Sequence, residues 1–309
     1  MRRLSVPSFA KINWTLKILG SRSDGYQQLR TIYQTIDLSE EVVFETTSTR
    51  GIQLEIEGRE VASGEDNLLY QTADLLRKTA GSQAGIRIKL EKKIPVGAGL
   101  GGGSSNAALA LLVLNQLWDC RMGEKELVDL AAQLGSDVPF FLVGGTAVGW
   151  GRGTEVVPLP DLPKEKSLLL LYPHLEISTG EAYSLGKWET YAGTQILTRE
   201  WVENTMQDLL RAVGPKGDGW SFLENDFEDV LFAHYPVLVE AREALKKAGC
   251  ERVMLCGSGS TLLGFGSDKQ VKEAAVVITR EGIGETFFCR TLSREQYRQV
   301  LTNSGLLLL

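Results

Sequence analysis

The segment Pro95-Val-Gly-Ala-Gly-Leu-Gly-Gly-Gly-Ser-Ser-Asn106 leads directly into an apolar run over residues 107–114. Glycine lacks a Cβ, so its backbone can turn tightly and let a ligand come close. We expect a helix to begin at Ser104 and Ser105, with the apolar run as its buried body. The free N–H groups of that helix's first turn, and the positive end of its dipole, would face the glycine-rich loop. The segment therefore predicts a loop that cradles phosphate groups.

Two nucleotide-binding patterns overlap in this segment. Gly97-x-Gly99-x-x-Gly102 satisfies the dinucleotide fingerprint, but glycine and serine continue where that motif needs a helix and a second parallel strand. The same residues match a Walker A motif except for its lysine, whose charge normally meets the β- and γ-phosphates. A loop without that lysine needs positive charge from elsewhere in the chain. The alternative is a glycine-rich connection before a buried helix, with no ligand.

The composition is typical of a globular chain. At 309 residues, with 43% apolar and 23% charged residues, the chain can bury a sizeable core. Prolines at positions 158, 160 and 163 predict a linker. We therefore expect two domains, over residues 1–160 and 161–309.

Charge and hydropathy limit the partners. A formal net charge of −6 repels nucleic acid, so a polyanionic small molecule would need local cations. No apolar stretch is long enough to span a membrane, and the basic start of the chain lacks the apolar core of a signal peptide. We expect a cytoplasmic protein that binds neither nucleic acid nor membrane. The spacing of the four cysteines and two histidines predicts neither a zinc site nor disulfides.

Hydrophobic periodicity predicts a strand-rich first third, followed by helices and a second mixed region. Expected strands cover residues 5–19, 34–46, 51–57, 85–92, 146–157 and 167–172, with two more around the Gly257-Ser-Gly-Ser260 turn. Expected helices cover residues 67–79, 104–118, 124–134, 199–213, 227–232 and 236–248. In the first strand Lys11 and Asn13 share one face, and Ala10, Ile12 and Trp14 share the other.

Three segments resemble, in order, the motifs of the GHMP kinases, which phosphorylate small alcohols with ATP. They are Phe9-Ala-Lys-Ile-Asn-Trp-Thr-Leu16, the glycine-rich segment and Cys256-Gly-Ser-Gly-Ser-Thr261. Four strings are most similar to the branch that acts on a cytidine diphosphate-linked methylerythritol: Ala10-Lys-Ile-Asn13, Asp24-Gly-Tyr26, Gly135-Ser-Asp-Val-Pro-Phe-Phe141 and Asn225-Asp-Phe-Glu228. The resemblance implies an α+β fold, with a ribosomal-S5-like N-terminal domain that binds ATP and a ferredoxin-like C-terminal domain. It also implies ATP and Mg²⁺ as cofactors.

The resemblance assigns catalytic roles to Lys11 and Asp137. Asp137 would accept or orient the proton of the substrate's hydroxyl, while Lys11 steadies Asp137 and the transferring phosphoryl group. From the residues alone, Asp137 could equally cap a short helix ahead of Pro139. Lys11 and Asn13 could equally form a solvated strand face.

The ATP contacts that the resemblance implies lie in the glycine-rich loop and at one position before it. They are Asn67, Pro95, Val96, Gly97, Ala98, Gly99, Leu100, Gly101, Gly102, Gly103, Ser104 and Ser105. Helix capping explains Asn67 equally well. The sequence shows no diagnostic carboxylate pair for magnesium, so its ligands stay unassigned, with Ser105 as a candidate indirect ligand.

Substrate contacts are implied at Asn13, Tyr26, Gln27 and Tyr183. Tyr26 and Tyr183 would sandwich the cytosine ring, and aromatic stacking on a base contributes about 1–3 kcal/mol. Tyr183 could also be an ordinary core residue. Two positions depart from the family pattern: Gln27 replaces the usual histidine, and Phe9 the usual proline. A backbone contact at Gln27 would preserve cytosine recognition.

The implied reaction transfers phosphate to the 2-hydroxyl of the methylerythritol in the non-mevalonate route to isoprenoid precursors. Two alternatives stay open. One is a GHMP kinase for homoserine or mevalonate. The other is a relative that senses a nucleotide or sugar without catalysis, since one fold can host several functions.

Overall fold

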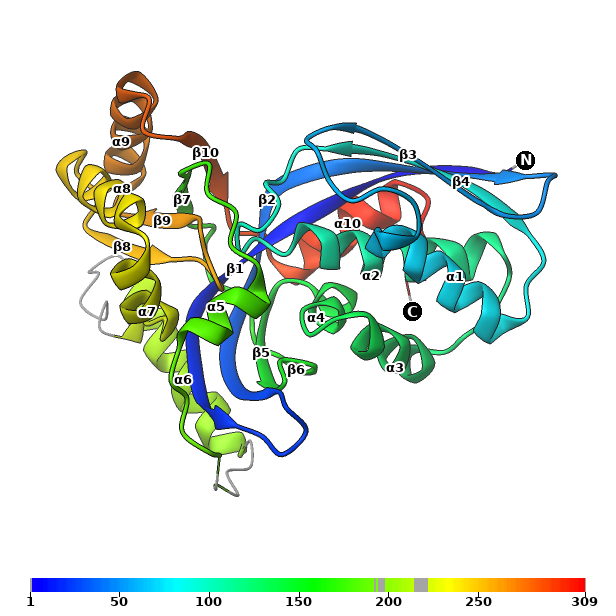
Figure 1. Cartoon of the computed structure of the whole chain (residues 1–309), viewed down its shortest axis with the longest axis horizontal. Helices are drawn as coiled ribbons and strands as arrows, with labels where there is room; N and C mark the ends of the chain where they lie inside the picture. Colours follow the sequence, from blue (N-terminus) through cyan, green and yellow to red (C-terminus); the bar gives the residue numbers. More distant parts are fainter. Residues whose placement is uncertain (1, 192, 194–197, 214–221, 309) are drawn as a thin grey trace.

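The structure, a computed structural model, describes residues 2–191, 193, 198–213 and 222–308. Its first half is built on a six-stranded sheet with the order β3-β4-β2-β5-β6, in which β1 also pairs with β2. The strands are β1 (Arg3–Ser21), β2 (Gln27–Thr47), β3 (Ile52–Gly58), β4 (Gly85–Lys92), β5 (Thr146–Gly151) and β6 (Glu155–Pro158). All pairs are antiparallel except β3 with β4. The long β1 and β2 ribbons run through the middle of the molecule (Figure 1).

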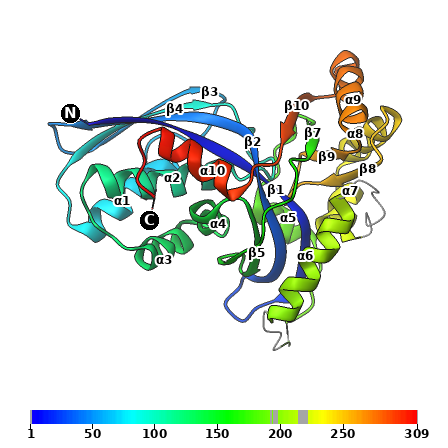
Figure 2. The same ribbon diagram turned by 180° about the vertical axis from the view of Figure 1, so that it is seen from behind.

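Helices cover one face of this sheet (Figures 1 and 2). They are α1 (Leu68–Ala80), α2 (Gly102–Leu117), α3 (Glu124–Leu134), α4 (Val138–Val143) and α10 (Arg294–Asn303), with a short 3-10 turn, η1 (Gly64–Asp66), before α1. Helix α2 is apolar almost all round, because it is enclosed by the sheet and by the helices beside it. The core of the first half therefore surrounds the helix that follows the glycine-rich loop.

The second sheet has four strands in the order β10-β7-β9-β8. They are β7 (Ser167–Tyr172), β8 (Arg252–Leu255), β9 (Leu262–Phe265) and β10 (Glu285–Arg290), accompanied by α5 (Thr179–Leu185), α6 (Arg199–Val213), α7 (Phe227–His234), α8 (Pro236–Lys247) and α9 (Asp268–Glu281). In β7, Leu168 and Leu170 face one core, while Leu169 and Leu171 face another. A strand covered on both faces needs an apolar residue at every position. This order and the helical crossovers give the expected ferredoxin-like arrangement.

The two halves meet along β1. Ala10, Ile12 and Trp14 are fully buried against the second sheet, and the rings of Trp14 and Phe265 lie 5.8 Å apart. The predicted alternation of this strand is confirmed, because Lys11 and Asn13 point to the opposite side. The first strand of the chain thus positions two polar side chains at the junction of the halves.

Helix α10 packs on the first half, although it follows the second sheet in the sequence. The Tyr297 hydroxyl donates a hydrogen bond to the Phe141 carbonyl at 2.6 Å, and Leu301 and Leu306 belong to the first core. The boundary expected between residues 160 and 161 stays a prediction. None of the helices in the described ranges is both long and apolar enough to cross a membrane.

Candidate active site

A cavity of about 500 Å³ lies where the glycine-rich loop, β1, β2 and the second half meet. Its wall includes residues 95–104 of the loop and Asp137, which directly precedes α4. Thr179 and Tyr183 of α5 and Ser258 of the β8–β9 turn complete it from the second half. The three segments that carry the family resemblance therefore contribute to one cavity.

The glycine-rich loop approaches the second half so closely that side chains would not fit. Gly99 has a φ of 75°, and a Cβ there would lie 2.0 Å from the carbonyl oxygen of Cys256. Helix α2 begins at Gly102, two residues before the predicted start, because Gly101 at φ 70° already takes the position before the helix. The first bond of the helix joins the Ser105 N–H to the Gly101 carbonyl. The N–H groups of residues 102–104 thus form the open end of the helix beside the cavity.

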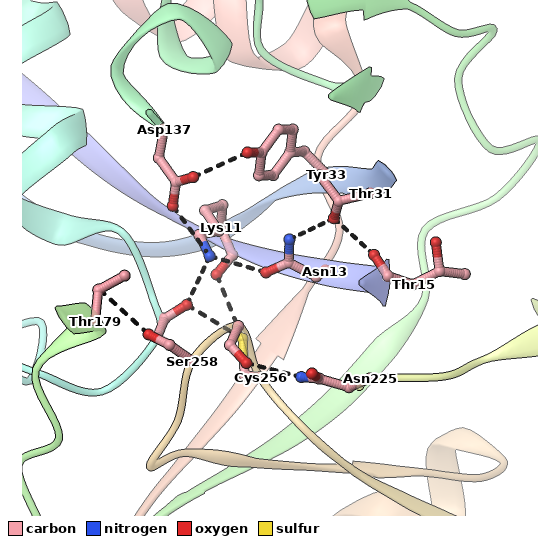
Figure 3. Close-up of polar contacts among 12 residues, drawn as sticks. Lys11, Asn13, Thr15, Thr31, Tyr33, Asp137, Thr179, Asn225, Cys256 and Ser258 are labelled. Carbon is pink, nitrogen blue, oxygen red and sulfur yellow. Dashed lines mark hydrogen bonds and ion pairs between the residues drawn. The ribbon is translucent and has the colours of Figure 1, made fainter. Parts of the chain in front are cut away.

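The Lys11 ammonium group binds three acceptors from three different segments (Figure 3). Its Nζ lies 2.8 Å from Asn13 Oδ1, 2.8 Å from the Gly99 carbonyl oxygen and 3.3 Å from Asp137 Oδ2. Lys11 and Asn13 are 3% and 2% exposed, so the alternative of a solvated strand face is wrong. The ammonium group joins the glycine-rich loop to the Asp137 carboxylate.

Two irregularities in the pairing of β1 with β2 bracket this lysine. The register shifts between Phe9 and Lys11, and again between Asn13 and Thr15. Bulges of this kind bend a strand and re-aim its side chains, and they are frequent beside active sites. Here they direct the side chains of Lys11 and Asn13 into the cavity.

Asp137 occupies the position before α4, but its side chain makes no capping hydrogen bond. Instead, Oδ1 accepts a hydrogen bond from the Tyr33 hydroxyl at 2.9 Å, and Oδ2 faces Lys11. The capping alternative for Asp137 is therefore wrong. Burial and the negative charge of Asp137 hold the pKa of Tyr33 well above its ordinary value, which keeps this tyrosine a hydrogen-bond donor.

A buried ion pair between Lys92 and Glu40 lies where β4 leads into the glycine-rich loop. Lys92 Nζ lies 2.7 and 2.9 Å from the two carboxylate oxygens of Glu40, and both side chains are almost completely buried. Glu40 also accepts hydrogen bonds from the N–H groups of Lys93 and Ile94 and from the Asn106 side chain. Burial lowers the pKa of Lys92, although the charge of Glu40 opposes that shift. The sequence analysis predicted neither the ion pair nor the hydrogen bonds of Glu40.

The other predicted nucleotide contacts divide into two groups. Residues 95–104 line the cavity, whereas Ser105 and Asn67 are absent from the residues described along its wall. The Ser105 hydroxyl accepts a hydrogen bond from Ser8 in the interior. Asn67 caps α1 by accepting from the Leu69 N–H at 2.9 Å, and its amide nitrogen donates to the Ala62 carbonyl. Capping thus accounts for the side-chain oxygen of Asn67, and the bond to Ala62 accounts for its nitrogen.

The predicted substrate residues are only partly brought together. Asn13 and Tyr183 line the cavity. Burial and the charge of Asp137 raise the pKa of Tyr183 above its ordinary value. Tyr26 is 51% exposed, and the Arg152 guanidinium lies 4.3 Å from its ring centroid. Gln27 accepts a hydrogen bond from the Ser21 hydroxyl. Neither Tyr26 nor Gln27 is among the described residues of the cavity wall.

Comparison with known proteins places these observations in a family. Residues 67–145 match the GHMP kinases N terminal domain, and residues 206–283 match the GHMP kinases C terminal domain. The 4-diphosphocytidyl-2-C-methyl-D-erythritol kinase of Moorella thermoacetica is 38% identical over 289 residues, which cover 94% of this chain and 99% of that protein. The enzyme of the same name from Pelotomaculum thermopropionicum is 38% identical over 265 residues, which cover 84% of this chain and 88% of the relative. The chain belongs to this kinase family.

A solved structure supports the same assignment. The crystal structure of 4-(cytidine 5'-diphospho)-2C-methyl-D-erythritol kinase matches this kinase with a TM-score of 0.75 at 31% identity, covering 93% of this chain and 99% of that one. The expected α+β fold with two GHMP kinase domains is confirmed, as is the expectation of an ATP-dependent small-molecule kinase.

Proposed function

We propose that this kinase transfers the γ-phosphoryl group of ATP to the 2-hydroxyl of 4-diphosphocytidyl-2-C-methyl-D-erythritol, giving the 2-phosphate and ADP. The reaction belongs to the non-mevalonate route to isoprenoid precursors, and we expect it to take place in the cytoplasm. The observation that carries the proposal is the contact between Lys11 and Asp137 beside the open end of α2 in one cavity. Family membership supports the choice of acceptor.

In this proposal, the phosphates of ATP lie in the loop of residues 95–104, where the N–H groups at the start of α2 face the leaving β-phosphate. Asp137 accepts the proton of the acceptor hydroxyl as its oxygen attacks the γ-phosphorus. The bond between the γ-phosphorus and the bridging oxygen breaks, and that oxygen leaves with ADP. Lys11 stabilises the negative charge on the moving group, because its ammonium already spans the loop and the carboxylate.

Magnesium would supply further neutralisation of the phosphate charges. Within the described part of the chain, Asp137 is the one carboxylate on the cavity wall, and Ser104 adds a hydroxyl there. Proteins usually hold Mg²⁺ through one or two carboxylates together with substrate phosphates rather than in a complete protein cage. This donor set fits that mode, with Ser104 better placed than Ser105.

Cytosine recognition is proposed for Tyr183 on the cavity wall and for Tyr26 on the β1–β2 hairpin. Tyr26 would have to turn away from Arg152 to face a base stacked on Tyr183. Gln27 would contribute through its backbone. We also propose that the chain has two domains, over residues 1–160 and 161–309.

The proposal is tested by product analysis. The protein is mixed with ATP, Mg²⁺ and a panel of alcohols that contains the cytidine diphosphate substrate, its uridine analogue, homoserine and mevalonate. A mass increase of one phosphoryl group on the cytidine compound alone is the expected result. Phosphorylation of homoserine or mevalonate instead would reject the proposed substrate, and equal rates with the uridine analogue would reject the cytosine site.

The role of Asp137 is tested by the variant Asp137→Asn. The side chain makes no capping bond and is 30% exposed, so we expect the variant to fold, with at most a partial loss of stability, and to lose turnover. Full activity in this variant would show that Asp137 does not take part in the reaction.

A further inference from the structure

Two side chains of β2, Thr31 and Tyr33, reach the cavity beside the proposed catalytic pair (Figure 3). They are two residues apart and therefore share a face of the strand. Both are 1% exposed, so they are fixed in the interior rather than free at the surface. Each donates its hydroxyl proton to a specific acceptor.

The Thr31 hydroxyl determines the orientation of the Asn13 amide. It donates to the Thr15 carbonyl at 2.6 Å and accepts from Asn13 Nδ2 at 2.7 Å. A hydroxyl has one proton, so once that proton is given to Thr15, the oxygen can only accept. The amide nitrogen of Asn13 must then face Thr31, and its oxygen must face Lys11. Thr31 thus supplies Lys11 with one of its three acceptors, through Asn13.

The Tyr33 hydroxyl determines the orientation of the Asp137 carboxylate. It donates to Oδ1, which leaves Oδ2 directed at Lys11. The Tyr33 ring is stacked on Phe140 of α4 with centroids 4.8 Å apart, so it contacts the helix that Asp137 precedes.

Two glycines leave the space that the tyrosine needs. A Cβ on Gly149 of β5 would lie 2.3 Å from the Tyr33 ring, and a Cβ on Gly153 would lie 2.8 Å from its hydroxyl oxygen. The ring is therefore enclosed by backbone on one side and by Phe140 on the other. This packing holds the ring where its hydroxyl meets Asp137.

We propose that Thr31 and Tyr33 are positioning residues for the phosphoryl transfer: acting through Asn13 and Asp137, they keep the ammonium of Lys11 between the phosphate loop and the carboxylate. This inference rests on the proposed function. If Thr31 lost its hydroxyl, the Asn13 NH₂ group would lose its acceptor, and the amide could shift to another partner and move its oxygen away from the ammonium of Lys11. If Tyr33 lost its hydroxyl, the Asp137 carboxylate could rotate away from the acceptor alcohol.

The test compares Thr31→Val, Thr31→Ser and Tyr33→Phe with two matched controls. Thr146→Val removes a buried hydroxyl that binds Gln34, and Tyr297→Phe removes a buried phenol hydroxyl that binds the Phe141 carbonyl. Neither control residue lies on the described cavity wall. For every variant, kcat, the KM values for ATP and acceptor, and the temperature of unfolding are measured.

A hydrogen bond to a charged group is worth enough to change a rate about tenfold or more, so kcat should fall by that factor in Thr31→Val and Tyr33→Phe. The KM values should change little, because neither residue is assigned to substrate binding. Thr31→Ser keeps the hydroxyl and should restore most of kcat. The two controls should keep kcat even where their unfolding temperature falls.

The inference is overturned if Thr31→Val and Tyr33→Phe keep the wild-type kcat, or lose no more than the controls. Failure of Thr31→Ser to exceed Thr31→Val would overturn it for Thr31. Failure of the proposed function is seen separately, as the absence of product from the wild-type protein with the cytidine diphosphate substrate. The same variants are then compared on the panel alcohol that the wild-type protein does phosphorylate, and a wild-type protein that phosphorylates none overturns both proposals.

Discussion

Replacement of Glu40 by glutamine should destabilise the protein and loosen the glycine-rich loop. The Glu40 side chain is fully buried, and its two oxygens accept two contacts from Lys92 and three further hydrogen bonds. In Glu40→Gln one oxygen becomes an NH₂ group, so at least one donor among these partners faces another donor. Lys92 also loses its counter-charge at a site where burial already lowers its pKa.

The expected magnitude follows from this geometry. Breaking a buried ion pair by removing one partner typically costs about 3–5 kcal/mol, because the remaining charge is left uncompensated. Since folded proteins are stable by only about 5–15 kcal/mol, such a loss is readily measured. Glu40 also holds the N–H groups of Lys93 and Ile94, the two residues that lead into the glycine-rich loop. Because the substitution should loosen this loop, we expect the KM for ATP to rise as well.

The assay is urea unfolding of the wild-type protein and Glu40→Gln, with Glu57→Gln as the control. Glu57 is an exposed glutamate on β3 of the same sheet, so its replacement should change stability by less than about 0.5 kcal/mol. Lys92→Met, made alone and together with Glu40→Gln, completes a double-mutant cycle. Lys92→Met should cost less in the Glu40→Gln background than in the wild-type protein. A loss in Glu40→Gln no larger than that of Glu57→Gln would refute the reasoning.

Three further predictions concern other parts of the structure. In Gly149→Ala, the new methyl group would lie 2.3 Å from the Tyr33 ring and 2.9 Å from the Thr31 methyl carbon. We expect kcat to fall and urea unfolding to show a stability loss of about 1–3 kcal/mol. Unchanged kinetics would contradict the tight fit around Tyr33. Asn67→Ala removes the cap of α1 and should lower stability by about 1 kcal/mol while the KM for ATP stays constant; a higher KM would instead assign Asn67 to the nucleotide. Burial raises the pKa of Glu228 above its ordinary value, against the opposing hydrogen bond from the Leu255 N–H. The folded state therefore binds this proton more tightly than the unfolded chain, and the stability present below the ordinary pKa is lost as the pH rises through the raised one. Glu228→Gln should lose less stability than the wild-type protein between pH 4 and pH 8, and parallel curves would rule out this contribution.

Much of the fold could be predicted because local pattern and tertiary structure agree. The expected bounds of β4, α3, β7 and α6 coincide with those observed, since the apolar pattern of each matches its burial. The pattern is periodic in β4, α3 and α6, and continuous in β7. The glycine-rich loop and the alternation of β1 were likewise readable, because backbone geometry and a period of two depend on neighbouring residues alone. Helices α5, α9 and α10 and strand β10 were not predicted, and α4 was expected only as the short helix in the capping alternative for Asp137. In α10 only Tyr297 and Leu301 are buried, which leaves a weak periodic signal.

The candidate site could be predicted where a residue acts through its own motif. Lys11, Asp137 and the loop of residues 95–104 meet at the cavity as expected. Thr31 and Tyr33 were missed because the expected strand began at Gln34, whereas β2 begins at Gln27. An earlier start would have placed both on one face of the strand; in the structure, β2 pairs Tyr33 directly with Asn13 of β1. Glu40 and Lys92 were missed because their pairing depends on contacts 52 residues apart, which sequence pattern does not show.

The return of α10 to the first half bears on how the chain folds during synthesis. Tyr297 packs against the segment of Phe141, a residue 156 positions earlier, so the first apolar core stays incomplete until residues 294–306 have left the ribosome. Synthesis at about 5–20 residues per second makes this delay on the order of ten seconds. A nascent chain that stalls before residue 297 would leave apolar surface of α4 and α2 exposed for as long as the stall lasts. Such a chain would be a target for chaperones.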